Sequence, residues 1–343
     1  MTDEQIPTDR PDGVYINLPE KVYFKQRRLG STSFQTLAGS TPADFYYETP
    51  WLNPDHEETD RSGDARDEGT ALHVLTLEGE AAFENKIAVR PDVYPDAKGV
   101  LKKWTMAAGW CKDWVAEQGE KPILSLAQVR RCRHMAALIL NHPELGRPMR
   151  SGLSEVSILY HLNGVPIRSR IDKLLPRFII DLKTYRASTR GRSVVEQCLN
   201  LVDDMNYDIQ RYLYDVARQR AREFIRSGEV YGASESQMDW LRKLAEVDDW
   251  KWCWLFNRKQ DDKAGAAPVV QPIYRSPDDI TYRSGQTKVE AGIQNYKAYM
   301  ARFGPDVPWA VVKPGYEPRD EEFSQWLSKI PTPEEIPEGT TDE

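Results

Sequence analysis

Three acidic residues and a lysine gather between positions 154 and 183 of the chain. Glu155 lies near the start of this stretch, Asp172 follows it, and Asp181 and Lys183 stand at its end. Carboxylate oxygens are the ligands that Mg²⁺ and Mn²⁺ prefer, and Mg²⁺ is usually held by one or two carboxylates together with water and substrate phosphate. A lysine beside such an ion could orient a water or stabilise charge that develops on a phosphate. The residue types and their spacing favour metal-dependent hydrolysis of a phosphodiester bond.

Three strands are expected to position these groups. Apolar residues alternate from Val156 to Tyr160, a second apolar run extends from Ile167 to Leu174, and a third from Phe178 to Leu182. The pair Asn163-Gly164 between the first two runs is a strong signal for a tight turn. The third run is mostly apolar, which predicts a central place in the sheet.

The period of a strand brings the ionisable groups together. Side chains alternate between the two faces of a strand, so Asp181 and Lys183 project from the same face and Asp172 can converge with them from the neighbouring strand. The alternative for an isolated D-x-K sequence is an ion pair on a surface hairpin. Glu155 and Asp172 on adjacent strands favour a metal site, because a core does not bury such charges without a metal or a partner.

Two flanking helices are expected to contribute further residues. His73 falls in a helical pattern over 68–78, where it could be a metal ligand or a packed or surface histidine. Gln210 and Tyr214 are spaced i, i+4 on a downstream helix and share a face, where they could support the site or be a core tyrosine beside a surface glutamine.

Five motifs occur in a fixed order: G-T-A-L-H at 69–73, S-E-V-S-I at 154–158, R-S-R-I-D-K at 168–173, I-I-D-L-K-T at 179–184 and Y-D-I-Q-R-Y-L-Y at 207–214. As a set they resemble the RecB-like branch of the PD-(D/E)xK nucleases. They are most similar to the C-terminal nuclease domain of the RecE-type exodeoxyribonucleases, the exonuclease VIII family. The resemblance implies an α/β fold with a restriction-endonuclease-like core, a central mixed sheet flanked by helices.

The resemblance also implies roles for individual residues. His73, Asp172 and Asp181 would be metal ligands, Lys183 the catalytic lysine and Glu155 an active-site carboxylate. The pair Gln210 and Tyr214 would support the site or contact DNA.

The activity implied is a Mg²⁺-dependent exodeoxyribonuclease, with Mn²⁺ as a substitute, acting 5′-to-3′ on ends of double-stranded DNA. The family is often phage-encoded, forms tetrameric rings and works with a RecT-type single-strand annealing protein. The alternatives left open are a RecB-like endonuclease, a single-strand exonuclease, and a non-catalytic DNA-end-binding module with the same fold.

The resemblance divides the chain of 343 residues into a polar segment, 1–13, a nuclease domain, 14–310, and an acidic, Pro- and Glu-rich tail, 311–343. A polar insertion of about 227–250 departs from the family pattern. Amphipathic helices are expected over 102–118 and 125–141, the second beginning after Ser125 as N-cap.

Composition excludes several classes of protein. The four cysteines are scattered and form no C-x-x-C pair, so neither a disulfide framework nor an iron–sulfur cluster is expected. The chain has no glycine-rich phosphate loop, which argues against ATP use. The sequence shows no apolar run of membrane-spanning length, and the first residues lack the apolar core of a signal peptide, so a cytoplasmic protein with no membrane association is expected.

The net charge of −7 does not exclude DNA binding, because acidic residues concentrate in 55–67 and 317–343. Basic residues form clusters elsewhere, and the cluster that directly follows the expected catalytic strand is the favoured DNA contact. It consists of Arg186, Arg190 and Arg192. The alternative for each such cluster is a solvated surface.

Overall fold

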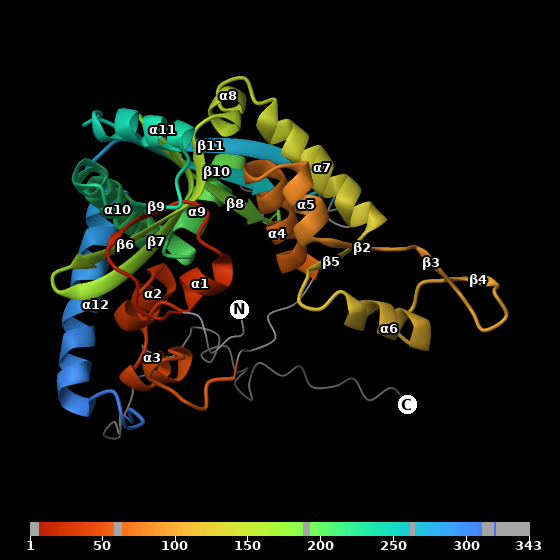
Figure 1. The fold of residues 1–343 in the computed structure, drawn as a ribbon, viewed down its shortest axis with the longest axis horizontal. Coiled ribbons are helices and arrows are strands. Elements are labelled where there is room, and N and C mark those ends of the chain that lie inside the picture. The colour runs from red at the N-terminus through yellow and green to blue at the C-terminus, as the bar shows by residue number, and fades with distance from the viewer. Residues whose placement is uncertain (1–6, 58–63, 188–192, 261–264, 311–318, 320–343) are drawn as a thin grey trace, which may run out of the picture.

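A mixed seven-stranded sheet forms the centre of the protein in a computed structural model, which describes residues 7–57, 64–187, 193–260, 265–310 and 319 (Figure 1). The strands are, in spatial order, β11 (Val269–Arg275), β10 (Lys251–Arg258), β8 (Phe178–Tyr185), β7 (Val165–Leu175), β6 (Leu153–Leu162), β1 (Gly13–Tyr15) and β9 (Val230–Tyr231). Strands β6, β7 and β8 pair antiparallel, whereas β8 and β10 pair parallel. The expected α/β architecture and the interior position of β8 are confirmed.

The β6–β7 hairpin turns where the sequence predicts it. Asn163 and Gly164 have φ values of 51° and 78°, the left-handed conformation that a two-residue hairpin turn of type I′ requires. Leu162 and Val165 pair on either side of the turn, which sets the register of both strands. A register fixed here determines which residues of β7 meet β6 at the other end of the hairpin.

Alternate residues of β8 and β10 face two separate hydrophobic cores. Trp252, Trp254 and Phe256 lie in the larger core, and Cys253 and Leu255 lie in the smaller one. The larger core is covered by α2 (Ser31–Gly39), α3 (Pro42–Glu48), α9 (Val194–Asp204), α10 (Tyr207–Ser227), α11 (Glu235–Ala245) and α12 (Ile280–Phe303). The smaller core is covered by α4 (Asp64–Leu77), α5 (Glu80–Lys86), α7 (Leu126–Leu140) and α8 (Gly146–Arg150).

Helix α10 is held closely against α12. A Cβ atom on Gly285 of α12 would lie 2.1 Å from the carbonyl oxygen of Asp208, so only glycine permits this approach. Ser284 and Lys288, which flank Gly285, bond the Asp208 carboxylate at 2.7 and 2.8 Å. This contact fixes the N-terminal turns of α10, which carry Gln210 and Tyr214.

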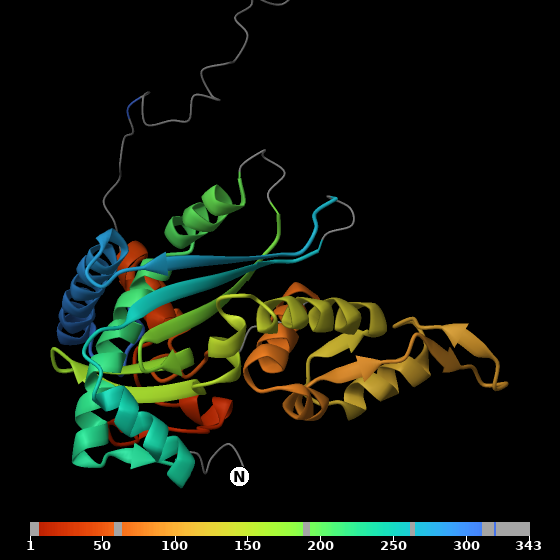
Figure 2. The same ribbon diagram turned by 90° about the horizontal axis from the view of Figure 1, so that it is seen from above.

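Residues 88–125 form an arm that extends away from the central sheet (Figure 2). It contains the parallel pair β2 (Ala88–Arg90) and β5 (Ile123–Ser125), the antiparallel pair β3 (Val93–Pro95) and β4 (Leu101–Lys103), and helix α6 (Gly109–Glu117). The helix expected over 102–118 is therefore too long, because its first residues pair with β3. The helix expected after Ser125 is confirmed, with a capping box between Ser125 and Gln128.

The remaining helix, α1 (Glu20–Phe24), packs near β1 in a small third cluster. None of the helices in the described ranges is long and apolar enough to cross a membrane. The domain bounds drawn from the sequence stay a prediction. Helix α11 lies within the expected insertion at 227–250, and all of 311–343 except Arg319 lies outside the described residues.

Candidate metal centre and active site

The two motif aspartates lie where β7 and β8 part. Lys173 and Ile180 are the last residues that pair between these strands, so the register places Asp172 opposite Asp181 just beyond the ladder. The Asp172 carboxylate accepts a hydrogen bond from the backbone amide of Leu182 at 2.8 Å. This bond gives the amide the partner that a backbone carbonyl of β7 would supply if the ladder continued. On its other edge β8 stays paired with β10, which holds Asp181 in place.

Glu155 reaches the same opening from β6. The pairs on either side of it, Ser154 with Lys173 and Val156 with Ile171, place Glu155 opposite Asp172. Its φ of 54° is left-handed, a conformation that costs a non-glycine residue on the order of 1–3 kcal/mol and that is concentrated at functional sites.

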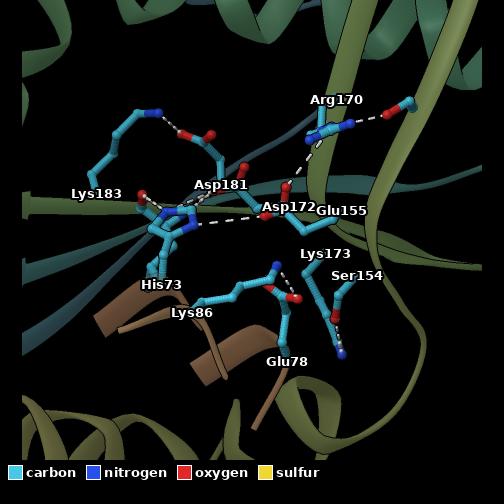
Figure 3. Close-up of polar contacts among 12 residues, drawn as sticks. His73, Glu78, Lys86, Ser154, Glu155, Arg170, Asp172, Lys173, Asp181 and Lys183 are labelled. Atoms are coloured by element: carbon cyan, nitrogen blue, oxygen red, sulfur yellow. Dashed lines mark hydrogen bonds and ion pairs between the residues drawn. The ribbon is translucent and has the colours of Figure 1, made fainter. Parts of the chain in front are cut away.

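Arg170 supports this part of the site. Its guanidinium lies 4.0 Å from the Glu155 carboxylate and donates to the Ser157 hydroxyl at 2.9 Å and to the carbonyl of Leu18 at 2.7 Å (Figure 3). Sequence reasoning missed this residue, although it lies two positions before Asp172 on the same strand and so shares its face.

His73 approaches both carboxylates from helix α4 (Figure 3). Its Nε2 lies 3.4 Å from Asp172 Oδ2 and 3.2 Å from the Leu182 carbonyl oxygen, and its Nδ1 lies 3.7 Å from Glu155 Oε1. Burial alone would lower the pKa of His73, but the Asp172 and Glu155 carboxylates outweigh it and raise that pKa to about 9. The protonated imidazole therefore attracts both carboxylates.

His73, Glu155 and Asp172 form a donor set suited to a divalent ion. One ligand atom of each side chain lies within 4.8 Å of the corresponding atoms of the other two. Two carboxylates and an imidazole suit Mn²⁺, and carboxylates with water suit Mg²⁺. Burial and the charge of Glu155 raise the pKa of Asp172, while the charges of His73 and Lys183 oppose this. A cation bound between Glu155 and Asp172 would relieve the repulsion between these two carboxylates.

Asp181, the third expected ligand, faces Lys183 instead. Its Oδ2 lies 2.7 Å from the Lys183 ammonium, and its side chain is fully buried. Burial raises the pKa of Asp181 to about 6, although the Lys183 charge acts against it. Burial alone would lower the pKa of Lys183, but Asp181 and Asp172 outweigh it and raise that pKa. The lysine is therefore held as a cation beside the candidate metal centre.

Helix α10 supports the Asp181–Lys183 pair. Gln210 accepts from Lys183 at 2.8 Å through its carbonyl, and its amide donates to Asp181 at 3.1 Å and to the Tyr214 hydroxyl at 2.8 Å. The Lys183 ammonium also lies 4.7 Å from the centre of the Tyr207 ring, within the range of a cation–π contact. Tyr207 is a second residue that sequence reasoning missed, although it opens the helix that carries Gln210.

The structure thus brings together seven of the ten expected site residues, namely His73, Glu155, Asp172, Asp181, Lys183, Gln210 and Tyr214. Arg186 is exposed three residues beyond Lys183, and Arg190 and Arg192 lie outside the described residues. Their role in DNA binding stays a prediction.

Comparisons with known proteins agree with this geometry. Residues 52–232 match the family described as "PDDEXK-like domain of unknown function (DUF3799)", and this segment contains all seven residues of the site. The crystal structure of a candidate exonuclease from Eubacterium rectale is similar to 88% of this chain and 97% of its own, with a TM-score of 0.50 and 15% sequence identity. This likeness concerns the fold. A search of curated proteins finds no match.

Proposed function

The chain belongs to this PDDEXK-like family, and from that premise we propose that it is a metal-dependent exodeoxyribonuclease that hydrolyses linear double-stranded DNA. The observation that carries the proposal is the donor set of His73, Glu155 and Asp172 beside the buried pair of Asp181 and Lys183. Metal ligands next to a fixed lysine cation suit the attack of a water molecule on a phosphodiester, because both positive charges stabilise the charge that develops on the phosphate.

His73, Glu155 and Asp172 would hold the ion, and Asp181 is a further ligand if it exchanges its contact with Lys183. The chemistry that a divalent ion supplies when bound is polarisation of a phosphoryl oxygen and a lower pKa for a coordinated water. Mg²⁺ is proposed as the natural ion, with Mn²⁺ as a substitute, because the set is dominated by carboxylates.

Lys183 contributes a positive charge to the reacting phosphate. Its ammonium is preorganised by Asp181, Gln210 and Tyr207, so it does not have to reorganise as charge develops in the transition state. The backbone amide of Leu182 holds Asp172 in one orientation, which keeps the ligand oxygen in the opening between β7 and β8.

The 5′-to-3′ direction and the preference for duplex ends rest on the resemblance to RecE-type enzymes alone. The exonucleolytic mode rests on the same resemblance and on a structural neighbour described as a candidate exonuclease. The same resemblance supports a role in phage-type recombination with a RecT-type partner, and a tetrameric ring. Light scattering over a concentration series tests the ring independently of activity.

A cleavage assay tests the function. Purified protein is incubated with linear and with closed circular duplex of the same sequence, with each 5′ or 3′ end labelled in turn. We expect EDTA to abolish degradation of the linear DNA, Mg²⁺ or Mn²⁺ to restore it, and circular DNA to stay intact. The Lys183→Met variant, which keeps most of the length of the side chain without its charge, is the matched control for a contaminating nuclease.

Other outcomes identify the alternatives. Equal cleavage of circular duplex indicates an endonuclease, and a strong preference for single strands indicates a single-strand exonuclease. Binding to DNA ends without cleavage in any divalent ion indicates a non-catalytic module.

A further inference from the structure

We propose that Arg131, Arg186 and Lys259 form a binding site for a backbone phosphate of the DNA strand, one or two nucleotides from the bond that is cut. This inference rests on the proposed function and adds a second contact on the same strand. The three basic residues, which we call the phosphate cluster, come from three different elements of the chain.

Two members of the phosphate cluster are brought together by the sheet. Strands β8 and β10 run parallel with Tyr185 opposite Arg258. Arg186 and Lys259 are the next residues of the two strands, so they lie side by side at the C-terminal ends of β8 and β10. The backbone amide of Lys259 donates to the carbonyl of Tyr185 at 2.8 Å, which extends the pairing to the cluster itself. Their proximity is therefore a consequence of strand register.

Helix α7 brings the third member, because it packs against α4. Arg131 forms an ion pair with Glu68 of α4, and the Cys132 thiol lies 3.6 Å from the carbonyl oxygen of the same residue. The next residue of α4 is Gly69. A Cβ atom on Gly69 would lie 3.4 Å from the Thr184 hydroxyl and 4.0 Å from the Lys259 ammonium. The helix therefore borders Lys259 and the end of β8 at this glycine.

The charges of the phosphate cluster repel one another. Burial lowers the pKa of Lys259, Glu68 acts against it, and Arg186 and Arg131 lower it further. A phosphate placed among the three side chains would partly compensate these charges, and its two non-bridging oxygens can accept hydrogen bonds from the arginine and lysine side chains. Glu68 is engaged with Arg131 and keeps this arginine directed to the α4 side.

The phosphate cluster lies beside the candidate metal centre on two elements. Gly69 precedes His73 by four residues, one turn of α4, which is about 6 Å along the helix axis. Thr184 directly follows Lys183 on β8. One strand of duplex DNA rises about 3.4 Å per nucleotide. The spacing suits neighbouring phosphates of one strand, with the reacting phosphate at the metal centre and another at the cluster.

Salt-dependent DNA binding tests this inference. Binding of a short blunt duplex is measured by fluorescence anisotropy at several salt concentrations, with Ca²⁺ in place of Mg²⁺ and the DNA checked for cleavage on a gel. We expect Lys259→Met to raise the Kd on the order of tenfold, as for a lost charge-assisted contact. The slope of log Kd against log salt should fall by up to about 0.9.

Two further variants sharpen the test. Lys251→Met removes the same charge from the exposed opposite end of β10 and should leave Kd and slope unchanged. Gly69→Asp keeps all three basic residues but adds a carboxylate beside Lys259, so it should weaken binding as well. Aspartate has a higher helix propensity than glycine, so this substitution within α4 is not expected to unfold the helix.

The outcomes separate this inference from the proposed function. Equal slopes for wild type, Lys259→Met and Gly69→Asp overturn the phosphate site even if the protein degrades DNA. A reduced slope in both variants supports the site even if Mg²⁺ produces no cleavage. Equal effects of Lys251→Met and Lys259→Met indicate a general charge effect and also overturn it.

Discussion

Asp172 and Asp181 face each other across β7 and β8 at the first position beyond the backbone ladder. The neighbours of each carboxylate differ. Asp172 is in contact with His73 and with the amide of Leu182, whereas Asp181 is in contact with Lys183 and Gln210. One aspartate therefore belongs to the candidate metal ligands and the other to the lysine, and a metal ion between the strands could engage both.

Asp172→Asn should abolish metal binding without unfolding the protein. The amide oxygen of asparagine can still accept the hydrogen bond from Leu182, and the loss of a buried negative charge removes a desolvation cost. Thermal unfolding with and without Mn²⁺ measures both effects. The wild type should gain about 2.7 kcal/mol at an ion concentration of one hundred times its Kd, and the variant should gain none. An equal metal-induced shift in both proteins would exclude Asp172 as a ligand.

Asp181→Asn and Glu155→Gln should affect metal affinity to different degrees. Asp181 is fully buried and opposite Asp172, whereas nearly a third of the Glu155 side chain is exposed and Arg170 lies beside it. A charge in a less polar environment contributes more, so loss of Asp181 as the further ligand that leaves Lys183 should weaken metal binding more than Glu155→Gln, which should weaken it on the order of tenfold. Calorimetric titration with Mn²⁺ compares them. If only Glu155→Gln abolishes binding, the ion is held by the set found in the structure without Asp181.

Lys183→Met should separate binding from turnover. Removal of the ammonium frees the Asp181 carboxylate, so metal affinity should be unchanged or higher. Turnover should fall by a factor on the order of 10² or more, as for other lost electrostatic contacts to a transition state. Single-turnover cleavage at saturating metal gives the rate. Near-normal turnover in this variant would mean that Lys183 is not the catalytic lysine.

The local part of the site could be predicted from the sequence. The Asn163-Gly164 turn sets the register of β6 and β7, and the period of two along β8 places Asp181 and Lys183 on one face. Both signals depend on residues close together in the chain. The spacing of Gln210 and Tyr214 on one helix is a local signal of the same kind.

The remaining features depend on contacts between distant segments. Residues 102 and 103 were expected at the start of a helix but lie in β4, because pairing with β3 overrides their local preference. The position of Lys259 beside Arg186 follows from strand register across the sheet, and the left-handed backbone of Glu155 lies within a strand whose apolar alternation is regular. Periodicity within one segment carries no information on either feature.

Metal affinity should rise with pH up to about 9. A metal binds neutral imidazole, and the carboxylates around His73 raise its pKa to about 9 despite burial. Below that pH an ion must displace the proton, so the logarithm of the association constant should rise by up to about one unit per pH unit and level off above it. In His73→Gln this slope should be lost. Equal slopes in both proteins would exclude His73 as a ligand.

The same shift gives a stability prediction of opposite sign for the metal-free protein. The pKa of His73 in the folded state, about 9, exceeds its ordinary value of 6.5, so the folded state binds the proton more tightly. This contribution to the free energy of unfolding is complete below pH 6.5 and is lost as pH rises through about 9. Urea unfolding in EDTA at a series of pH values measures it. His73→Gln should remove this loss between the two pH values, and an unchanged pH dependence in the variant would contradict the assignment.

Gln210→Glu should slow cleavage although it preserves the size of the side chain. Only an amide can accept from Lys183 and also donate to Asp181 and Tyr214, and a carboxylate would place a second negative charge about 3.1 Å from Asp181. The lysine would then be shared between two carboxylates. We expect single-turnover rates to fall on the order of tenfold, while Tyr214→Phe, which removes one outer hydrogen bond, has a smaller effect. If Gln210→Glu cleaves at the wild-type rate, α10 has only a structural role and Lys183 is positioned by Asp181 alone.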